Sequence, residues 1–347
     1  MISIGGRAIG PGHPPFVVAE LSGNHNGDLE RALAIVDAVA DAGAHALKLQ
    51  TYTPDTLTID CDAPPFRLGE EHELWGGESL YRLFERAHTP WAWHEPIFAR
   101  ARERGLAAFS APFDPTAVEL LEKLGVPAYK IASSEIVDLP LIRLAAGTGK
   151  PLIISTGMAT VSEIEAAVSA ARGAGCTQLA VLSCTASYPA SPSESNLRAL
   201  PLLAAITGEV VGLSDHTPGL GAALAAVALG ACVIEKHVTL SRADGGVDSA
   251  FSLEPAELAA LVVESERAWE SLGEVAIGPR PSEREGLRFR RSLYVVRDVS
   301  AGEPVTPENV RSIRPAGGLP PDSAATVMGR RFTRDVPFGT PLTWDLI

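Results

Sequence analysis

Eight short apolar segments alternate along this chain with longer stretches of helical periodicity, and this alternation limits the folds open to it. Each segment is rich in β-branched residues and precedes a polar cluster, which is typical of βα units around a parallel sheet. Eight strands and a closing helix at 255–271 occupy about 270 residues, as expected of an α/β protein with a (β/α)8 TIM barrel. The predicted strands are 16–20, 44–50, 106–110, 128–132, 151–155, 178–183, 210–213 and 231–235.

Helix signals support the connections between these strands. The segment 29–42 has apolar residues at spacings of three and four and follows Asp28, a residue typical of an N-cap. A second helix is expected over 162–174. The connection at 53–95 is enlarged, and because connections after barrel strands form the active face, we interpret 74–81 either as a lid or as an excursion without function.

A change of composition divides the chain. Residues 273–290 are rich in Gly, Pro and alternating charges, so we expect a barrel domain at 1–272, a linker at 273–290 and a second domain at 291–347. Short alternating runs at 292–296 and 331–336 favour a small, mostly β unit there. So small a unit is marginally stable alone and is expected to gain stability from a larger partner.

The charge and hydropathy of the chain exclude several classes of function. A net charge of −13 over 347 residues argues against a nucleic-acid-binding surface. The longest apolar stretch, 221–234, is too short for a bilayer span, so no membrane anchor is expected. The N-terminus lacks the pattern of a secretory signal, which predicts a cytoplasmic protein. No C-x-x-C spacing occurs, so we expect reduced thiols at Cys61, Cys176, Cys184 and Cys232.

Two histidines stand at the ends of neighbouring predicted strands. Equivalent positions on adjacent parallel strands lie close together, so His216 and His237 can converge on one ion. Two imidazole ligands leave coordination positions open for water or substrate, which suits a Lewis-acidic divalent metal, Mn²⁺ or Mg²⁺. The alternative is a pair of histidines that orient substrate or contact phosphate.

Two lysines also stand at strand ends. Lys48 and Lys130 are expected to point across the barrel mouth and to form an anion clamp with hydroxyl groups, suited to a ligand with a carboxylate and a phosphate. The hydroxyl groups are those of Ser133, Ser155 and Ser214. Two alternatives remain: local pairing of the lysines with Glu20, Glu135 or Glu235, and a Schiff-base role for Lys130 or Lys236, as in barrel aldolases.

Three further residues are candidates for contact with substrate. Glu20 can serve as a general acid or base whose pKa is tuned by Lys48, or it can form a salt bridge. Asp248 and Tyr188 are placed to hydrogen-bond a polyol, or they cap loops.

Eight motifs, in order along the chain, resemble those of the sialic acid synthase family, whose members join phosphoenolpyruvate to an amino-sugar aldehyde. The motifs are AELSGNHNG (19–27), LKLQTY (47–52), SAPFD (110–114), YKIASSE (129–135), STGM (155–158), SCTASYP (183–189), GLSDHT (212–217) and EKHVT (235–239). The resemblance extends over nearly the whole chain, because RRSLYV and RPAGG (314–318) are similar to parts of the family's antifreeze-like (SAF) domain.

The resemblance implies roles for individual residues. It implies a metal bound by His216 and His237, and catalytic roles for these histidines and for Glu20, Lys48 and Lys130. Phosphoenolpyruvate contacts are implied for Lys48, Lys130, Ser133, Ser155 and Ser214, and sugar contacts for Glu20, Gln50, Tyr188, Asp248 and Arg314. Arg314 matches an arginine that the SAF domain extends into the partner's barrel, which implies a domain-swapped homodimer.

Two departures bear on the choice of sugar. Ala111 and Ala186 stand where neuraminate synthases commonly have Thr and Asn. The chain resembles more closely the pseudaminic acid synthases of this family, whose sugar is 2,4-diacetamido-2,4,6-trideoxy-L-altrose. N-acetylneuraminate or legionaminate synthesis by the same chemistry, a Schiff-base aldolase, and a non-catalytic glycan- or ice-binding module remain as alternatives.

Overall fold

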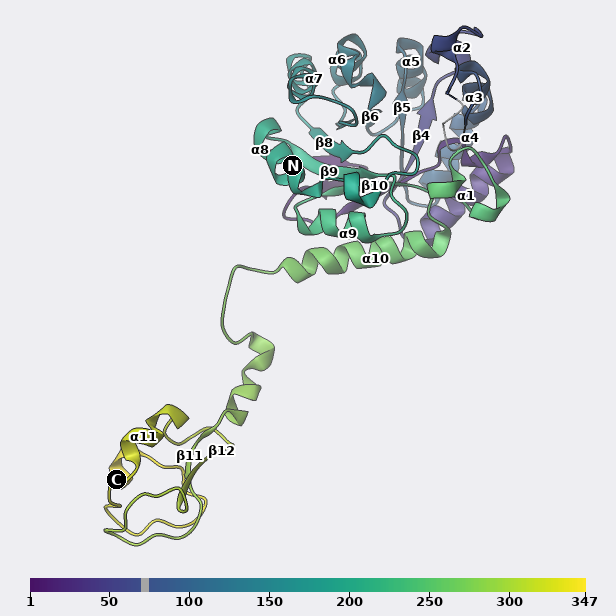
Figure 1. The fold of residues 1–347 in the computed structure, drawn as a ribbon. Helices are drawn as coiled ribbons and strands as arrows, with labels where there is room; N and C mark the ends of the chain where they lie inside the picture. The colour runs from purple at the N-terminus through teal and green to yellow at the C-terminus, as the bar shows by residue number, and fades with distance from the viewer. Residues whose placement is uncertain (70–74) are drawn as a thin grey trace. The chain divides into compact units, whose positions relative to one another are not determined.

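Eight parallel strands close into a barrel in the computed structural model, which describes residues 1–69 and 75–347 (Figure 1). They follow one another around the ring in chain order, and the last pairs with the first. The predicted (β/α)8 barrel is confirmed, and no strand end differs from its predicted position by more than two residues. The strands are β3 (Phe16–Glu20), β4 (Ala46–Thr51), β5 (Ala107–Pro112), β6 (Tyr129–Ile131), β7 (Leu152–Ser155), β8 (Leu179–Cys184), β9 (Val210–Asp215) and β10 (Val233–His237).

Helices surround the strands, as Figure 1 shows. Their apolar faces and the strands form one core, because strands covered on both faces must be apolar throughout. The predicted N-cap is confirmed, since the Asp28 side chain accepts a hydrogen bond from Glu30 N. The helices are α1 (Leu29–Asp41), α4 (Trp91–Glu103), α5 (Pro115–Lys123), α6 (Leu139–Gly147), α7 (Val161–Gly173), α8 (Leu200–Thr207), α9 (Gly221–Ala228) and α10 (Pro255–Leu272).

An N-terminal hairpin precedes the barrel and was not predicted. It pairs β1 (Ile2–Ile4) with β2 (Arg7–Ile9) antiparallel, and its isoleucines belong to the core of the barrel. Gly5 and Gly6 form the turn with φ of 57° and 82°, values that favour glycine. Strands of three residues are too short for an alternating pattern to stand out in the sequence.

The enlarged connection between β4 and β5 contains, in its described residues, two short α-helices before α4. These are α2 (Pro54–Leu57) and α3 (Leu80–Ala87), and the chain then continues into α4. Ser79 caps α3 by accepting a hydrogen bond from Arg82 N. Of the lid predicted at 74–81, Leu74 lies outside the described residues.

The chain divides into two compact units, Met1–Gly273 and Glu274–Ile347. The second unit pairs β11 (Ser292–Val295) antiparallel with β12 (Val310–Ile313), contains α11 (Ala324–Val327) and has its own apolar core. The expected strand at 331–336 is wrong: its end residues form only single bridges, to Pro304 and Val299. In the parts of the chain that are described, no helix is both long and apolar enough to cross a membrane.

Candidate active site

Four charged side chains lie buried together at the barrel mouth. Glu20, Lys48 and Glu235 are adjacent because β4, β3 and β10 are consecutive around the ring, with Glu20 paired in register to Lys48. Lys130 comes from β6, which is not a neighbour of these strands, and reaches Glu235 across the barrel. Lys48 Nζ lies 2.5 Å from Glu20 Oε2 and 3.3 Å from Glu235 Oε1. Lys130 Nζ lies 3.7 Å from Glu235 Oε1. The two lysines therefore meet at the mouth, and each is also paired locally with a glutamate.

Burial and ion pairing shift the pKa values of the four charged groups in different directions. Burial raises the pKa of Glu20 to about 7 despite the nearby Lys48 ammonium. Burial also opposes ionisation of Glu235, but Lys130 and Lys48 outweigh it and lower the pKa of that carboxyl to about 2. Burial lowers the pKa of Lys130, whereas the two glutamates outweigh burial at Lys48 and raise its pKa. Glu20 can therefore exchange a proton near neutral pH while Glu235 stays ionised.

Three hydroxyl groups stand at the ends of strands around this cluster. Ser214 Oγ donates a hydrogen bond to Glu235 Oε1 at 3.0 Å, and Ser133 Oγ accepts one from Gly157 N at 3.1 Å. Ser155 Oγ is buried and has no hydrogen-bond partner among the residues that the structure describes. Since a buried hydroxyl is normally satisfied, Ser155 is available to a ligand.

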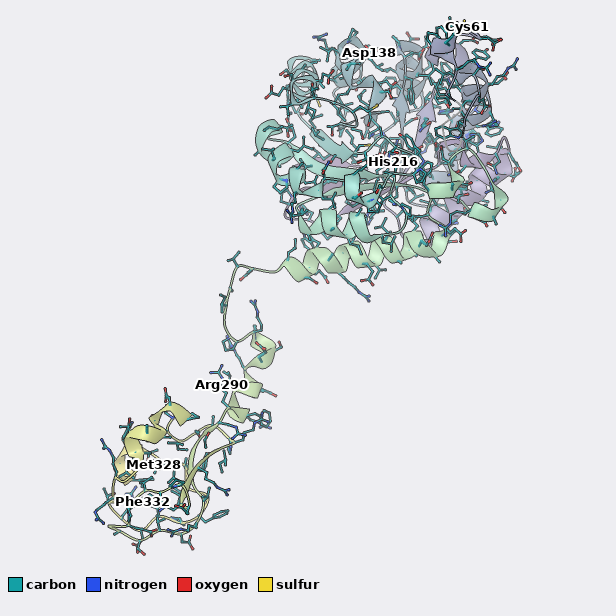
Figure 2. The ribbon with its side chains drawn as sticks, viewed as in Figure 1. Cys61, Asp138, His216, Arg290, Met328 and Phe332 are labelled. Atoms are coloured by element: carbon teal, nitrogen blue, oxygen red, sulfur yellow. The ribbon has the colours of Figure 1, made fainter. Side chains whose placement is uncertain are left out.

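The two candidate metal ligands face each other. The ring centroids of His216 and His237 lie 5.2 Å apart, and Figure 2 labels His216 within the barrel. His216 Nδ1 lies 2.9 Å from Thr185 O, so a proton on Nδ1 leaves the Nε2 lone pair free. His237 Nδ1 is buried, makes no hydrogen bond within the described chain, and lies 4.0 Å from Asp248 Oδ2.

These histidines fit a metal ion as a pair. Burial lowers the pKa of both rings, so both are neutral at pH 7, the form in which imidazole binds a metal. Within residues 1–69 and 75–347, no group of three or more His, Cys, Asp and Glu side chains is arranged to hold an ion. The protein thus offers two imidazole nitrogens to an ion, and the buried Nδ1 atom of His237 has no hydrogen-bond partner among the described residues, as suits a metal ligand.

Three of the residues predicted to contact the sugar line one pocket of about 220 Å³, together with Ser133 and His237, whereas Glu20 is not part of its lining. Gln50, Tyr188 and Asp248 all lie there. The Tyr188 ring centroid lies 4.4 Å from that of His216, and Asp248 accepts a short hydrogen bond from Ser22 Oγ. Arg314 follows β12 in the second unit, so its expected contact with the sugar stays a prediction.

Two findings differ from what the sequence indicated. Lys236, a candidate Schiff-base lysine, instead donates hydrogen bonds to Asp215 Oδ2 and Thr217 O. Ser22 was not singled out, although it binds Asp248 from 226 residues away. The sequence contains a signal for this position of Lys236. Successive side chains along a strand point to opposite faces, so when Glu235 and His237 point into the mouth, Lys236 between them must point away from it.

Comparison with known proteins gives the family. A model described as the NeuB family matches residues 35–276, and a SAF domain model matches residues 290–347. This chain belongs to the NeuB family. It is 40% identical over 333 residues to the pseudaminic acid synthase of Helicobacter pylori, covering 96% of this chain and 97% of that protein.

Two further NeuB-family relatives are similar along most of their length. The pseudaminic acid synthase of Campylobacter jejuni is 40% identical over 327 residues, covering 94% of this chain and 95% of the relative. A crystal structure of the N-acetylneuraminic acid (sialic acid) synthetase of Leptospira borgpetersenii superposes with a TM-score of 0.72 at 36% identity. That match covers 82% of this NeuB-family chain and 94% of the other.

Proposed function

We propose that this chain is a pseudaminic acid synthase, a transferase that forms a carbon–carbon bond. Its substrates are phosphoenolpyruvate and 2,4-diacetamido-2,4,6-trideoxy-L-altrose, and its products are a nine-carbon 2-keto sugar acid and phosphate. The observation that carries the proposal is the buried cluster of Lys48, Lys130, Glu20 and Glu235 beside the facing histidines. The two pseudaminic acid synthases that are 40% identical support the choice of sugar.

The cluster supports the binding of phosphoenolpyruvate. Lys48 and Lys130 supply two ammonium groups, and Ser155 supplies a hydroxyl without a partner in the described residues. Charge-assisted hydrogen bonds from such donors hold carboxylate and phosphate groups strongly in a buried site. Ser133 and Ser214 complete the proposed set at the ends of neighbouring strands.

The proposed reaction is an aldol-type condensation. C3 of phosphoenolpyruvate forms a bond to the aldehyde carbon of the open-chain sugar, whose carbonyl oxygen takes up a proton and becomes a hydroxyl group. The C2=C3 π bond of phosphoenolpyruvate breaks in this step, and water then adds at C2 and loses a proton. The bond from C2 to the phosphate oxygen breaks as the new C2 hydroxyl gives its proton to the departing phosphate, which leaves the 2-keto acid. Glu20, with a pKa of about 7, is suited to give or take a proton in these steps, and the two lysines stabilise the anion throughout.

His216 and His237 would hold the divalent ion, Mn²⁺ or Mg²⁺. When bound, the ion supplies Lewis acidity toward the aldehyde oxygen. Gln50, Tyr188 and Asp248 orient the sugar from the shared pocket. Asp248 is fixed for this task by its hydrogen bond from Ser22.

The direct test is phosphate release from phosphoenolpyruvate with three acceptors. The diacetamido-trideoxy altrose should give the highest kcat/KM, against N-acetylmannosamine and the legionaminate precursor. A higher value with either of the other two would replace the sugar assignment and keep the chemistry. No phosphate release with any of them would overturn the proposed function and favour a binding module.

Metal dependence is tested separately. EDTA should abolish turnover, and Mn²⁺ or Mg²⁺ should restore it. His237→Ala should weaken Mn²⁺ binding, measured by electron paramagnetic resonance, while circular dichroism shows the fold retained. Full turnover after removal of metal, or an unchanged rate in His237→Ala, would contradict the metal assignment.

A Schiff-base aldolase remains the second candidate because one observation favours it. Burial lowers the pKa of Lys130, and a neutral amine is the form that attacks a carbonyl. Borohydride added with a keto-acid substrate should leave the mass of the protein unchanged if phosphoenolpyruvate is the donor. A trapped adduct at Lys130 would establish the aldolase instead.

We also propose a domain-swapped homodimer, in which Arg314 of one subunit contacts the sugar in its partner. Arg314→Ala and His237→Ala should each be inactive alone. Mixed dimers of the two variants should regain activity, because one barrel then has both its histidine and an intact arginine from the other subunit. Mixed dimers that stay inactive would place Arg314 in its own barrel or remove its role.

The proposed location is the cytoplasm. Cys61, Cys176, Cys184 and Cys232 form no disulfide, as is usual for proteins of reducing compartments. Fractionation of the native host should recover the activity with cytoplasmic markers; recovery with periplasmic markers would contradict this location.

A further inference from the structure

One side of the sugar pocket is made of side chains for which the reaction has no use. Five residues form it, and we name them the apolar wall: Tyr52, Leu57, Leu83, Phe84 and Phe113. Tyr52 follows β4, and Phe113 follows β5. The other three belong to α2 and α3, in the enlarged connection between those strands. The wall therefore comes largely from a segment added to the basic barrel.

The wall is preformed. The Tyr52 ring packs edge-on against Phe113 at a centroid distance of 5.2 Å and against Phe84 at 5.8 Å. Tyr52 and Leu83 are only 3% and 5% exposed, so neither can turn away without disrupting its neighbours. Trp91 Nε1 donates to the Tyr52 carbonyl at 3.2 Å and fixes the backbone there.

Helix α3 approaches closely the turn that follows the neighbouring strand β3. The 3-10 turn Ser22–His25 contacts Ala87, the last residue of α3. A Cβ atom at Gly23 would lie 3.3 Å from Ala87 Cα, so the glycine allows α3 to sit this near the strand ends. Because Ser22 in the same turn binds Asp248, the apolar wall and the sugar-orienting carboxylate are positioned by one short segment.

Most of the polar lining residues of the pocket lie outside this wall. Gln50, Asp248 and Glu135 line the same pocket, and Glu135 Oε2 is buried without a hydrogen-bond partner in the described chain. A ligand that fits must therefore present polar groups toward these residues and a non-polar group toward the wall. A hydroxyl group placed against Leu57, Leu83, Phe84 or Phe113 would lose its hydrogen bonds to water and gain none from these side chains.

We propose that the apolar wall determines acceptor specificity by binding a methyl group of the sugar. This inference rests on the proposed function and deepens it. A methyl group gains from burial against Leu83 and the aromatic rings, whereas a hydroxymethyl group in the same place pays for desolvation. The methyl group is either the deoxy carbon at the end of the sugar or the methyl of an acetamido group, and the acceptors below separate these sources.

The first experiment compares matched acceptors with the wild-type enzyme. One pair differs only in having a terminal methyl or a hydroxymethyl group, and a second pair differs only in having acetamido or hydroxyl at one carbon. The pair whose methyl group meets the wall should differ about 10- to 100-fold in kcat/KM, the range that hydrophobic pockets achieve. Ratios near one in both pairs would overturn the proposal.

The second experiment changes the wall. Leu83→Thr and Phe84→Ala should bring the ratio of the discriminating pair toward one, and the KM for phosphoenolpyruvate should stay the same. Leu144→Thr is the matched control, because Leu144 lies on α6 and is 43% exposed. An unchanged ratio in both wall variants, with the fold retained by circular dichroism, would contradict the proposal.

Binding measurements keep this inference separate from the proposed function. The alditols of the same sugars have no aldehyde and cannot condense, so calorimetry with them reports recognition alone. Preferential binding of the methyl-bearing alditol without phosphate release from any aldehyde would overturn the proposed function and support the wall. Phosphate release from the aldehydes together with equal affinities for the alditols would support the proposed function and overturn the role of the wall.

Discussion

The Lys236 ammonium lies 3.0 Å from the Asp215 carboxylate, and each residue directly precedes a histidine proposed to bind metal. Both side chains are 1% exposed, and Lys236 also donates to Thr217 O. The ion pair thus joins β9 to β10 on the opposite face of these strands from Glu235 and His237. It fixes the spacing of the strand ends that carry His216 and His237.

Removing one partner of this pair should be costly. Asp215→Ala leaves a buried ammonium without its counter-charge and should lower the free energy of unfolding by about 3–5 kcal/mol. The double variant Asp215→Leu with Lys236→Met removes both charges and should lose less. Urea denaturation measures both, and a loss below about 1 kcal/mol in Asp215→Ala would show that the pair does not hold the strands.

Gly157→Ala should damage phosphoenolpyruvate binding through Ser133. A Cβ atom at position 157 would lie 2.7 Å from Ser133 Oγ and 3.0 Å from Ala186 Cβ, so the serine must move. We expect the KM for phosphoenolpyruvate to rise about 10-fold, the loss of roughly one hydrogen bond, with little change in the KM for the sugar. Gly173→Ala on α7, where a Cβ meets nothing within 4 Å, is the control. Equal effects of the two substitutions would contradict this explanation.

Lys48→Met should weaken phosphoenolpyruvate binding more strongly. It removes a proposed anion donor and also the ammonium that neutralises Glu20 and Glu235. Hydrogen bonds to charged groups contribute about 1.5–3 kcal/mol, so kcat/KM for phosphoenolpyruvate should fall at least about 10-fold. Lys123→Met removes an exposed lysine on α5 and should leave kcat/KM unchanged. If the two variants behave alike, Lys48 does not contact the anion.

Glu135 should make stability depend on pH. Burial is the main cause that raises the pKa of its carboxyl to about 7, against an ordinary value of 4.5. The folded state therefore binds this proton more tightly than the unfolded state, and the resulting stability is present below pH 4.5 and lost as pH rises to about 7. Glu135→Gln cannot titrate. Denaturation from pH 4 to pH 8 should show a smaller loss of stability in this variant, and parallel curves would refute the assignment.

Much of the barrel could be predicted because its strands are covered on both faces and read as apolar runs. Phe16–Glu20 is such a run, and its predicted and observed ends agree. The hairpin at Ile2–Ile9 was not predicted because its strands have only three residues each, too few for a recognisable pattern. The expected strand at 331–336 failed because alternation alone does not supply a neighbouring strand, and only two bridges form there.

The residues of the site could be predicted where they end a strand, as Ser155 and His237 do. Contacts between loops that are far apart in the chain leave no comparable pattern in the sequence. Ser22 meets Asp248 only because the turn after β3 and the loop after β10 lie side by side in the folded barrel. The apolar wall was missed for a related reason, since Leu83 and Phe84 belong to a short helix whose partner Tyr52 lies about thirty residues earlier.

The seam between β3 and β10 pairs Glu20 with His237, joining the earliest barrel strand to the latest. The charge cluster joins side chains of β3, β4, β6 and β10, so it is complete only once the last strand has paired with the first. A nascent chain still lacking β10 would thus have no Glu235 to balance its lysines and no second imidazole. The enzyme can therefore be active only when the whole barrel is complete. Chains that terminate before β10 should have no activity at all, rather than reduced activity.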